Sequence, residues 1–373
     1  MEKKMKVPLE HPRPDIEDFV EIITRRKTPG RVPLVELHID KEVIKYITEK
    51  KLGEKWIEPS SNDRKTQKIA LKNYINCWYR LGYDFVRLSG DFRFLAGLSF
   101  TSKVRKGRDT ASLSRGQRNW VEEEKGVISS WKDFEEYPWP SVDKVDLWPY
   151  EFISENLPEG MGIFACPSMG IFEVGVNELF GYENLCYLIY DNPDLVKAAF
   201  DRIGELIYEW YRKIVGLKNL VGFFQGDDMG FKTSTLLSPD FLKDHVLPWH
   251  KKIASLAHEH GLLYLLHSCG NIDSIMKDLI EDVKIDAKHS FEDDIMPVTV
   301  FKKKYGNRVG VLGGVDMDKL CRLKEDELRE YVDNILDECM QGGGYALGSG
   351  NSITNYVPVK NYFIMLDEGL KQK

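Results

Sequence analysis

Short apolar runs alternate with longer amphipathic segments along most of the chain. A short apolar run bounded by turn residues is typical of a buried strand, whereas apolar residues three or four positions apart are typical of a helix. Strands that alternate with helices favour an α/β TIM-type (β/α)8 barrel, with an open doubly wound sheet as the rival. The pattern predicts eight strands, at 32–37, 85–89, 162–166, 222–225, 262–268, 285–289, 309–313 and 345–348.

Three of the predicted helices have clear boundary signals. One is predicted at 194–215 from its helical spacing of apolar residues. A second begins after Ser238, because serine is a favoured N-cap and a proline follows it, and it should break at Pro248 before ending at Gly261. The third, at 324–340, is stopped by a run of glycines. The fingerprint GxGxxG follows no early strand, which disfavours a dinucleotide-binding sheet.

The connection at about 91–160 is too long for a simple turn, so we interpret 1–373 as one barrel domain with a large insertion. Long connections usually have a function, such as covering a substrate. Its first part is basic, so it would bind an anionic substrate or an acidic partner, or it would simply be a solvated loop. The basic residues are Lys103, Arg105, Lys106, Arg108, Arg115 and Arg118. Its second part should pack onto the barrel through Trp120, Trp131, Phe134, Tyr137, Trp139 and Trp148.

Composition and charge exclude several function classes. The formal net charge is −7 without a long block of like charges, so the basic footprint of a nucleic-acid-binding protein is absent. The first seven residues lack the apolar centre of a secretory signal, and no stretch approaches the roughly 18 apolar residues of a membrane span. Six scattered cysteines without a CxxC pair indicate reduced thiols, and hence a cytoplasmic protein.

The strongest chemical signal is His267 with Cys269, directly after the apolar run 262–266. Side chains two positions apart on a strand point the same way. A neutral imidazole and a thiolate are both good zinc ligands. In parallel α/β folds the carboxyl end of the strands is where sites are built, so the pair predicts a metal site.

Other predicted strand ends also carry polar residues. Asp227 and Asp228 follow the fourth strand, where a pair of acids would either serve chemistry or cap a turn. Glycines at 313–314 and 348–350 would either cradle a phosphate or allow close packing. The remaining polar residues at strand ends are Glu36, His38, Cys166, His289, Glu292, Asp316 and Asn351.

Several of these segments together resemble the uroporphyrinogen decarboxylase superfamily, whose fold is a TIM-type barrel. The likeness covers about residues 20–370. The segments that carry it are Gly226-Asp227-Asp228-Met229-Gly230, Leu237-Ser238-Pro239, 248–253 (PWHKKI), His267-Ser268-Cys269-Gly270-Asn271, Gly313-Gly314-Val315-Asp316 and Gly342-Gly343-Gly344-Tyr345, with 130–134 (SWKDF) and 183–193 upstream.

The superfamily contains at least two chemistries. One branch decarboxylates the acetate arms of uroporphyrinogen without a cofactor, and it has an arginine-rich N-terminal motif resembling Arg-Gln-Ala-Gly-Arg. This chain reads GRVPLVE at 30–36 instead, which disfavours that branch.

The other branch contains methyltransferases that exchange methyl groups with a corrinoid protein, coenzyme M or related acceptors. These enzymes bind zinc through a His-x-Cys pair and a distant cysteine near the eighth strand, and His267 with Cys269 matches the pair. Gly350 or Asn351 stands where the distant cysteine is expected, so the third ligand stays open. Oxygen ligands are acceptable to zinc, and the candidates are Cys166, Asp227, Asp228 and Glu292.

The resemblance therefore implies a zinc-dependent methyltransferase that moves a methyl group to or from a corrinoid protein. Asp227 or Asp228 would complete the metal shell or act as a general acid–base group, with Glu292 in the same roles. No Asp-x-His-x-x-Gly motif occurs, so the corrinoid would arrive on a partner protein. A small methyl donor or a thiol acceptor would be the other substrate, and a homodimer is left open.

Two alternatives remain. One is a metal-free decarboxylase or lyase of the same superfamily. The other is a non-catalytic protein that binds a corrinoid or tetrapyrrole, and the missing distant cysteine is the argument for both.

Overall fold

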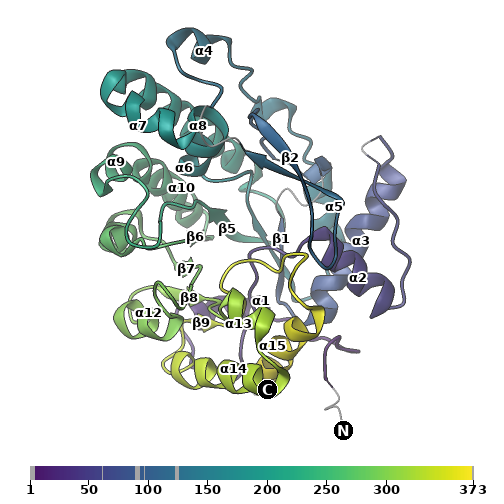
Figure 1. The fold of residues 1–373 in the computed structure, drawn as a ribbon. Coiled ribbons are helices and arrows are strands. Elements are labelled where there is room, and N and C mark those ends of the chain that lie inside the picture. Colours follow the sequence, from purple (N-terminus) through teal and green to yellow (C-terminus); the bar gives the residue numbers. More distant parts are fainter. Residues whose placement is uncertain (1–4, 61, 89–92, 96, 122–125, 372–373) are drawn as a thin grey trace.

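The computed structural model of the chain describes residues 5–60, 62–88, 93–95, 97–121 and 126–371 (Figure 1). Residues 1–4, Ser89 at the end of one predicted strand, and the first positions of the predicted insertion lie outside these ranges. The side chain of Trp120 is also outside the described part.

A parallel sheet of seven strands forms the centre of the molecule, and it curls around a common interior with helices outside (Figure 1). Along the sheet each strand is followed by the next strand of the set in chain order, without the reversal of a doubly wound sheet. The TIM-type α/β prediction is therefore confirmed. The strands are β1 (Phe85–Leu88), β4 (Gly162–Ala165), β5 (Leu220–Gly226), β6 (Leu263–His267), β7 (Ala287–His289), β8 (Gly310–Leu312) and β9 (Tyr345–Ala346).

The segment at 32–37, predicted to be a strand, does not form one. It forms a single parallel bridge, between Leu34 and Leu347, the residue that follows β9. The amide of Val35 donates to the carbonyl of Leu347 at 2.8 Å, and the amide of Leu347 donates to the carbonyl of Pro33 at 2.8 Å. Proline has no N–H to continue a ladder, so the apolar run predicted the burial of this segment correctly but not its pairing.

Helices cover the outside of the sheet. The predicted helix at 194–215 is α8 (Pro193–Ile214), and the predicted break near Pro248 separates α9 (Pro239–His245) from α10 (Leu247–Glu259). The third predicted helix is α14 (Glu325–Cys339). Outside the predicted insertion, the other described helices of four residues or more are α1 (Ile16–Ile23), α2 (Lys41–Lys50), α3 (Arg64–Leu81), α7 (Tyr182–Asp191), α12 (Val298–Tyr305), α13 (Met317–Arg322), α15 (Val359–Lys371) and the π-helices η3 (Val174–Phe180) and η5 (Leu279–Val283).

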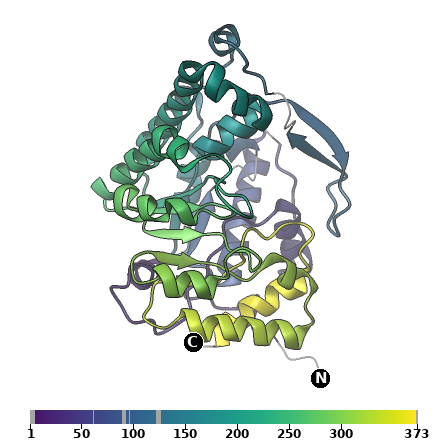
Figure 2. The same ribbon diagram turned by 60° about the vertical axis from the view of Figure 1, so that its left-hand side comes forward.

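The predicted insertion contains a two-stranded hairpin, β2 (Val104–Arg108) and β3 (Gln117–Val121), followed by α4 (Trp131–Glu136) and α5 (Trp148–Asn156). The hairpin stands away from the body of the molecule, and its turn returns towards the C-terminal region (Figure 2).

Several polar contacts hold the turn of the hairpin against the barrel. The guanidinium of Arg115 lies 2.6 Å from a carboxylate oxygen of Asp40, and the amide of Leu113 donates to the carbonyl of Asn355 at 3.1 Å. The hairpin is therefore tied to the barrel at its far end.

The aromatic residues that follow the hairpin pack the insertion onto the barrel, as predicted. The ring of Trp139 lies 4.7 Å from that of Tyr137 and 5.3 Å from that of Phe134. Tyr137 is buried, and Phe134, Trp139 and Trp148 pack against the core, whereas Trp131 is exposed. A role for the exposed basic residues of the hairpin stays a prediction.

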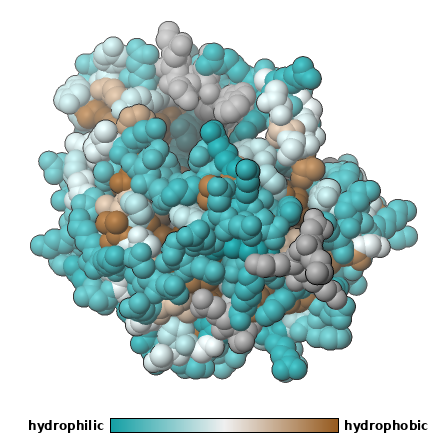
Figure 3. All heavy atoms as spheres, turned by 60° about the horizontal axis from the view of Figure 1, so that its bottom comes forward, coloured by the Kyte–Doolittle hydropathy of each residue, from teal (hydrophilic) through white to brown (hydrophobic). Residues whose placement is uncertain are grey.

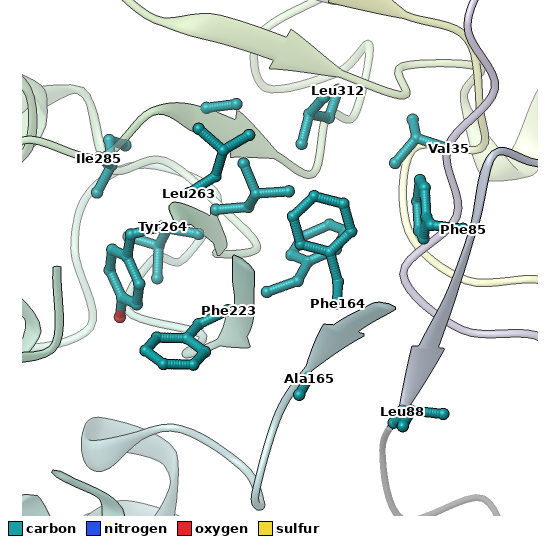
Figure 4. Close-up of a cluster of buried hydrophobic side chains, with 14 of the residues drawn as sticks. Val35, Phe85, Leu88, Phe164, Ala165, Phe223, Leu263, Tyr264, Ile285 and Leu312 are labelled. Atoms are coloured by element: carbon teal, nitrogen blue, oxygen red, sulfur yellow. The ribbon is translucent and has the colours of Figure 1, made fainter. Parts of the chain in front are cut away.

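The interior of the sheet is filled by apolar side chains that alternate along the strands (Figure 4). The rings of Phe85 and Phe164 meet edge to face at 4.9 Å, and that of Phe224 lies 6.4 Å from Phe164. Each fully buried phenylalanine contributes on the order of 1.5–3 kcal/mol by removal from water. In contrast, the face drawn in Figure 3 is mainly hydrophilic, with small and scattered apolar patches.

Among the described residues, no helix combines the length and the apolar character needed to cross a bilayer.

Glu36 connects the segment at 32–37 to the loop after β9. The side chain is fully buried, and it accepts hydrogen bonds from the amide of Ser349 at 2.9 Å and from its hydroxyl at 2.6 Å. Burial raises the pKa of Glu36 to about 8, because the two hydrogen bonds from Ser349 compensate only part of the lost hydration.

We predict that Glu36→Gln flattens the pH dependence of stability. Between its ordinary pKa of 4.5 and about 8, the folded chain holds one more proton than the unfolded chain, so the free energy of unfolding falls as pH rises. At about 1.4 kcal/mol per pKa unit, the loss amounts to a few kcal/mol. Urea unfolding of both proteins from pH 5 to pH 8 measures it. The exposed Glu49→Gln should keep the wild-type slope, and an equally steep slope in Glu36→Gln would contradict the prediction.

Candidate metal centre

Asp228, His267 and Cys269 bring three ligand atoms together at the carboxyl end of the sheet, all within 4.8 Å of one another. The parallel register sets Gly226 of β5 beside His267 of β6, so the residues that follow both strands meet. Nε2 of His267 lies 3.3 Å from a carboxylate oxygen of Asp228 and 3.4 Å from the sulfur of Cys269.

Two glycines allow the loops after β5 and β6 to interlock. The amide of Gly230 donates to the carbonyl of Cys269 at 3.1 Å. A Cβ atom on Gly230 would lie 2.6 Å from that carbonyl oxygen, and one on Gly270, whose φ is +76°, would lie 2.3 Å from the backbone of Gly230. The amide of Cys269 also donates to Asp228 at 2.8 Å. The main chain thus fixes the relative positions of the acid and the thiol.

His289 of β7 orients the ring of His267. The two Nδ1 atoms are 2.7 Å apart, and Nε2 of His289 lies 3.2 Å from the carbonyl oxygen of Ser349. A carbonyl only accepts, so Nε2 of His289 carries the hydrogen and its Nδ1 accepts from Nδ1 of His267. Burial, followed by the charge of His267, lowers the pKa of His289 well below its usual value. Nδ1 of His267 therefore carries a hydrogen, and Nε2, which faces Asp228 and Cys269, is the ring nitrogen that could bind a metal.

The sulfur of Cys269 has two hydrogen-bond donors. The amide nitrogen of Asn351 lies 3.1 Å away and the hydroxyl of Ser290 lies 3.4 Å away. Asn351 therefore occupies the region where the resemblance places a distant cysteine. Burial, followed by the charge of Asp228, raises the pKa of the Cys269 thiol well above its usual value. The thiol keeps its proton unless a cation binds beside it.

Asp227 points away from this group and towards α6 (Ile171–Glu173) and α10. Its buried carboxylate accepts from the amides of Phe172 at 3.1 Å and Glu173 at 2.9 Å, which begin the short helix α6 (Ile171–Glu173). Nε2 of His250 lies 2.8 Å from the same carboxylate. Asp227 thus fixes α6 and α10 against the end of β5.

The other two candidates for the third ligand also lie outside the group. The thiol of Cys166 lines the same cavity but donates to the carbonyl of Ser168 at 3.0 Å. Glu292 is half-buried and borders a separate small pocket beside Lys288. Among the described residues, Asp228 is the candidate that the structure brings to His267 and Cys269.

Glu173 is a site residue that the sequence pattern missed. Its carboxyl group lines the cavity beside Asp228. Burial, followed by the charges of Asp228 and Asp227, raises its pKa well above the usual value. Burial in this setting therefore favours the protonated form of the carboxyl group. No strand-end signal marked it, since it lies several residues beyond β4, in an apolar segment.

A cavity of about 390 Å³, a size suited to a small molecule, borders Asp228 and His267 of this group. Its lining combines apolar side chains with a few polar groups, and it includes Leu37, Arg87, Leu98, Cys166, Met169, Glu173, Asp228, His267 and Asn351.

The donor set fits zinc. Catalytic zinc sites have three protein ligands of the nitrogen, sulfur and oxygen types and an open fourth position. Ligands of one tetrahedral zinc ion, at about 2.0–2.3 Å from it, lie roughly 3.3–3.8 Å apart. The separations of His267 from Asp228 and from Cys269, 3.3 and 3.4 Å, agree with this geometry.

Comparisons with known proteins agree with this architecture. A methyltransferase from Methanosarcina mazei shares the fold with a TM-score of 0.69 and 16% sequence identity, over 96% of this chain and 99% of that chain. A B12-independent methionine synthase from Shewanella sp. W3-18-1, solved in complex with selenomethionine, gives a TM-score of 0.52 and 12% identity, over 92% and 96% of the two chains. No curated protein sequence matches the chain.

The family itself is identified by sequence. A family model described as uroporphyrinogen decarboxylase (URO-D) matches residues 177–369, which is more than half of the chain. This segment includes Asp228, His267, Cys269 and Asn351. As the resemblance predicted, the chain belongs to the uroporphyrinogen decarboxylase family.

Proposed function

We propose that the protein is a zinc-dependent methyltransferase that moves a methyl group to or from a corrinoid protein. The observation that carries the proposal is the convergence of Asp228, His267 and Cys269 at the edge of a cavity that Asp228 and His267 line. The solved structures named above support it by fold, and one of them is named as a methyltransferase.

The residues of the chain have separate roles in this proposal. His267, Cys269 and Asp228 hold the metal, which when bound supplies Lewis-acid activation of a thiol or of a leaving group. His289 keeps Nε2 of His267 free for ligation. Glu173 holds a proton at its carboxyl group, ready for the atom from which the methyl group departs.

The corrinoid would be bound by a partner protein, with its cobalt presented at the mouth of the barrel. Such a carrier supplies the methyl chemistry, while this chain orients the second substrate. The β2–β3 hairpin stands beside the body of the molecule and would form part of the docking surface (Figure 2).

One observation favours the alternative of a metal-free decarboxylase or a binding protein. Asn351 contacts Cys269 where the methyltransferases have a cysteine ligand. The amide of Asn351 donates to the sulfur and so stabilises a thiolate. Asparagine in place of a cysteine, however, leaves only two soft ligands, His267 and Cys269. Metal content separates these functions.

We predict about one zinc ion per chain in anaerobically purified wild-type protein. His267→Ala and Cys269→Ser should each lose the metal, because each removes one of three ligands, and Asp228→Asn should bind it more weakly. Elemental analysis after gel filtration measures the content. The matched control is Cys166→Ser, which alters a thiol of the same cavity outside the ligand group and should keep the metal.

A protein without metal, which also takes up none when zinc is supplied, would contradict the zinc mechanism and favour the metal-free alternative. If zinc is bound, the reaction is tested with methylcobalamin and a small thiol, by the loss of the methyl–cobalt absorbance. A wild-type rate above that of Cys269→Ser supports methyl transfer. A zinc-loaded protein without transfer in either direction would contradict it.

We further predict that His289→Phe weakens zinc binding by about 10- to 100-fold, the usual cost of losing the outer hydrogen-bond partner of a ligating histidine. Phenylalanine fills a similar volume but cannot accept from Nδ1 of His267. Competition with a chromophoric chelator measures the affinity, and thermal unfolding checks the fold. Unchanged affinity in a folded variant would show that the ring of His267 is fixed without His289.

A further inference from the structure

Arg87 of β1 is a buried cation at the cavity. Arg87 is 5% exposed, and it borders the cavity that His267 and Asp228 also line. Phe85, two positions earlier on the same face of β1, points into the barrel interior (Figure 4). The guanidinium of Arg87 lies over the ring of Phe224, 5.1 Å from its centre.

The hydrogen bonds of Arg87 leave its charge uncompensated. Nε and Nη2 donate to the carbonyl of Phe224 at 3.1 and 2.9 Å, and Nη1 donates to the carbonyl of Leu37 at 2.8 Å. A guanidinium has five N–H groups, so these three bonds leave two. Among the described residues, no carboxylate forms an ion pair with it.

A second arginine of the chain shows the usual arrangement. Arg329 is also 5% exposed, and it forms ion pairs with Asp367 at 3.0 Å, Glu325 at 3.0 Å and Glu368. Burial of a charge is costly unless an opposite charge accompanies it. The fold meets this requirement at Arg329 within the chain, whereas among the described residues Arg87 has only carbonyl oxygens and the ring of Phe224 as partners.

We propose that Arg87 binds an oxyanion, such as a carboxylate, on the small-molecule substrate of this site. The two free N–H groups would donate to its oxygens, and the ring of Phe224 and the two carbonyls fix the guanidinium in place. Because the same cavity reaches Asp228 and His267, the ligand has an anionic end at Arg87 and its reacting atom near the metal ligands. The role as a substrate site rests on the proposed function, whereas the oxyanion site itself does not.

The test compares propionate with propionamide, which have the same shape but differ in charge. Binding is measured by calorimetric titration at fixed ionic strength to the wild-type protein and to a His267→Ala/Cys269→Ser variant. The double variant removes direct ligation of propionate by a metal. We expect both proteins to bind propionate at least about tenfold more tightly than propionamide, since hydrogen bonds to charged groups are the strong ones.

Arg87→Met and Arg87→Gln should both abolish this preference. Two variants are used so that the test still holds if one of them fails to fold. Arg87→Lys keeps the charge and should keep part of the preference. Thermal unfolding and circular dichroism confirm that each variant is folded.

Equal binding of propionate and propionamide by the wild-type protein would overturn the inference, and so would a preference that survives in folded Arg87→Met and Arg87→Gln. Loss of the preference in the His267→Ala/Cys269→Ser variant would assign it to the metal site instead, which also overturns the inference. A wild-type protein that contains no zinc but prefers propionate through Arg87 would refute the zinc mechanism and leave the oxyanion site intact.

Discussion

The interlock between the loops after β5 and β6 is the constraint on which the site depends. Parallel pairing sets Gly226 beside His267, and the close contact of Gly230 with Gly270 brings the following residues together. A side chain at either glycine would force the two loops apart. The carboxylate of Asp228 and the thiol of Cys269 therefore meet because main-chain atoms meet first, and the amide of Cys269 completes the arrangement.

A line of buried polar groups extends from this point across the barrel. His267 contacts His289, His289 contacts the carbonyl of Ser349, and Ser349 contacts Glu36. The pKa of His289 is lowered and that of Glu36 is raised, so both are held in their neutral forms. The barrel interior thus orients the metal ligands through neutral hydrogen bonds, which avoids the cost of several buried charges.

The sequence predicted the parts of this arrangement that depend on local pattern. Apolar runs located seven strands of the sheet, and the alternation of side chains paired His267 with Cys269. The different roles of Asp227 and Asp228 could not be predicted from sequence. Only the position of α6 shows that the buried carboxylate of Asp227 faces α6 and not the metal ligands. Glu173 and Arg87 were missed for a similar reason. Glu173 lies several residues beyond β4, and Arg87 lies within β1. Both were missed because their roles depend on a cavity formed by segments that are distant in the sequence.

The central claim is that Asp228, His267 and Cys269 bind one zinc ion, and X-ray absorption at the zinc edge tests it most directly. The account predicts a single sulfur at about 2.3 Å together with nitrogen and oxygen at about 2.0–2.2 Å, and loss of the bound zinc, with its sulfur signal, in Cys269→Ser. Zinc without sulfur in its shell, or a sulfur signal that survives in Cys269→Ser, would contradict it.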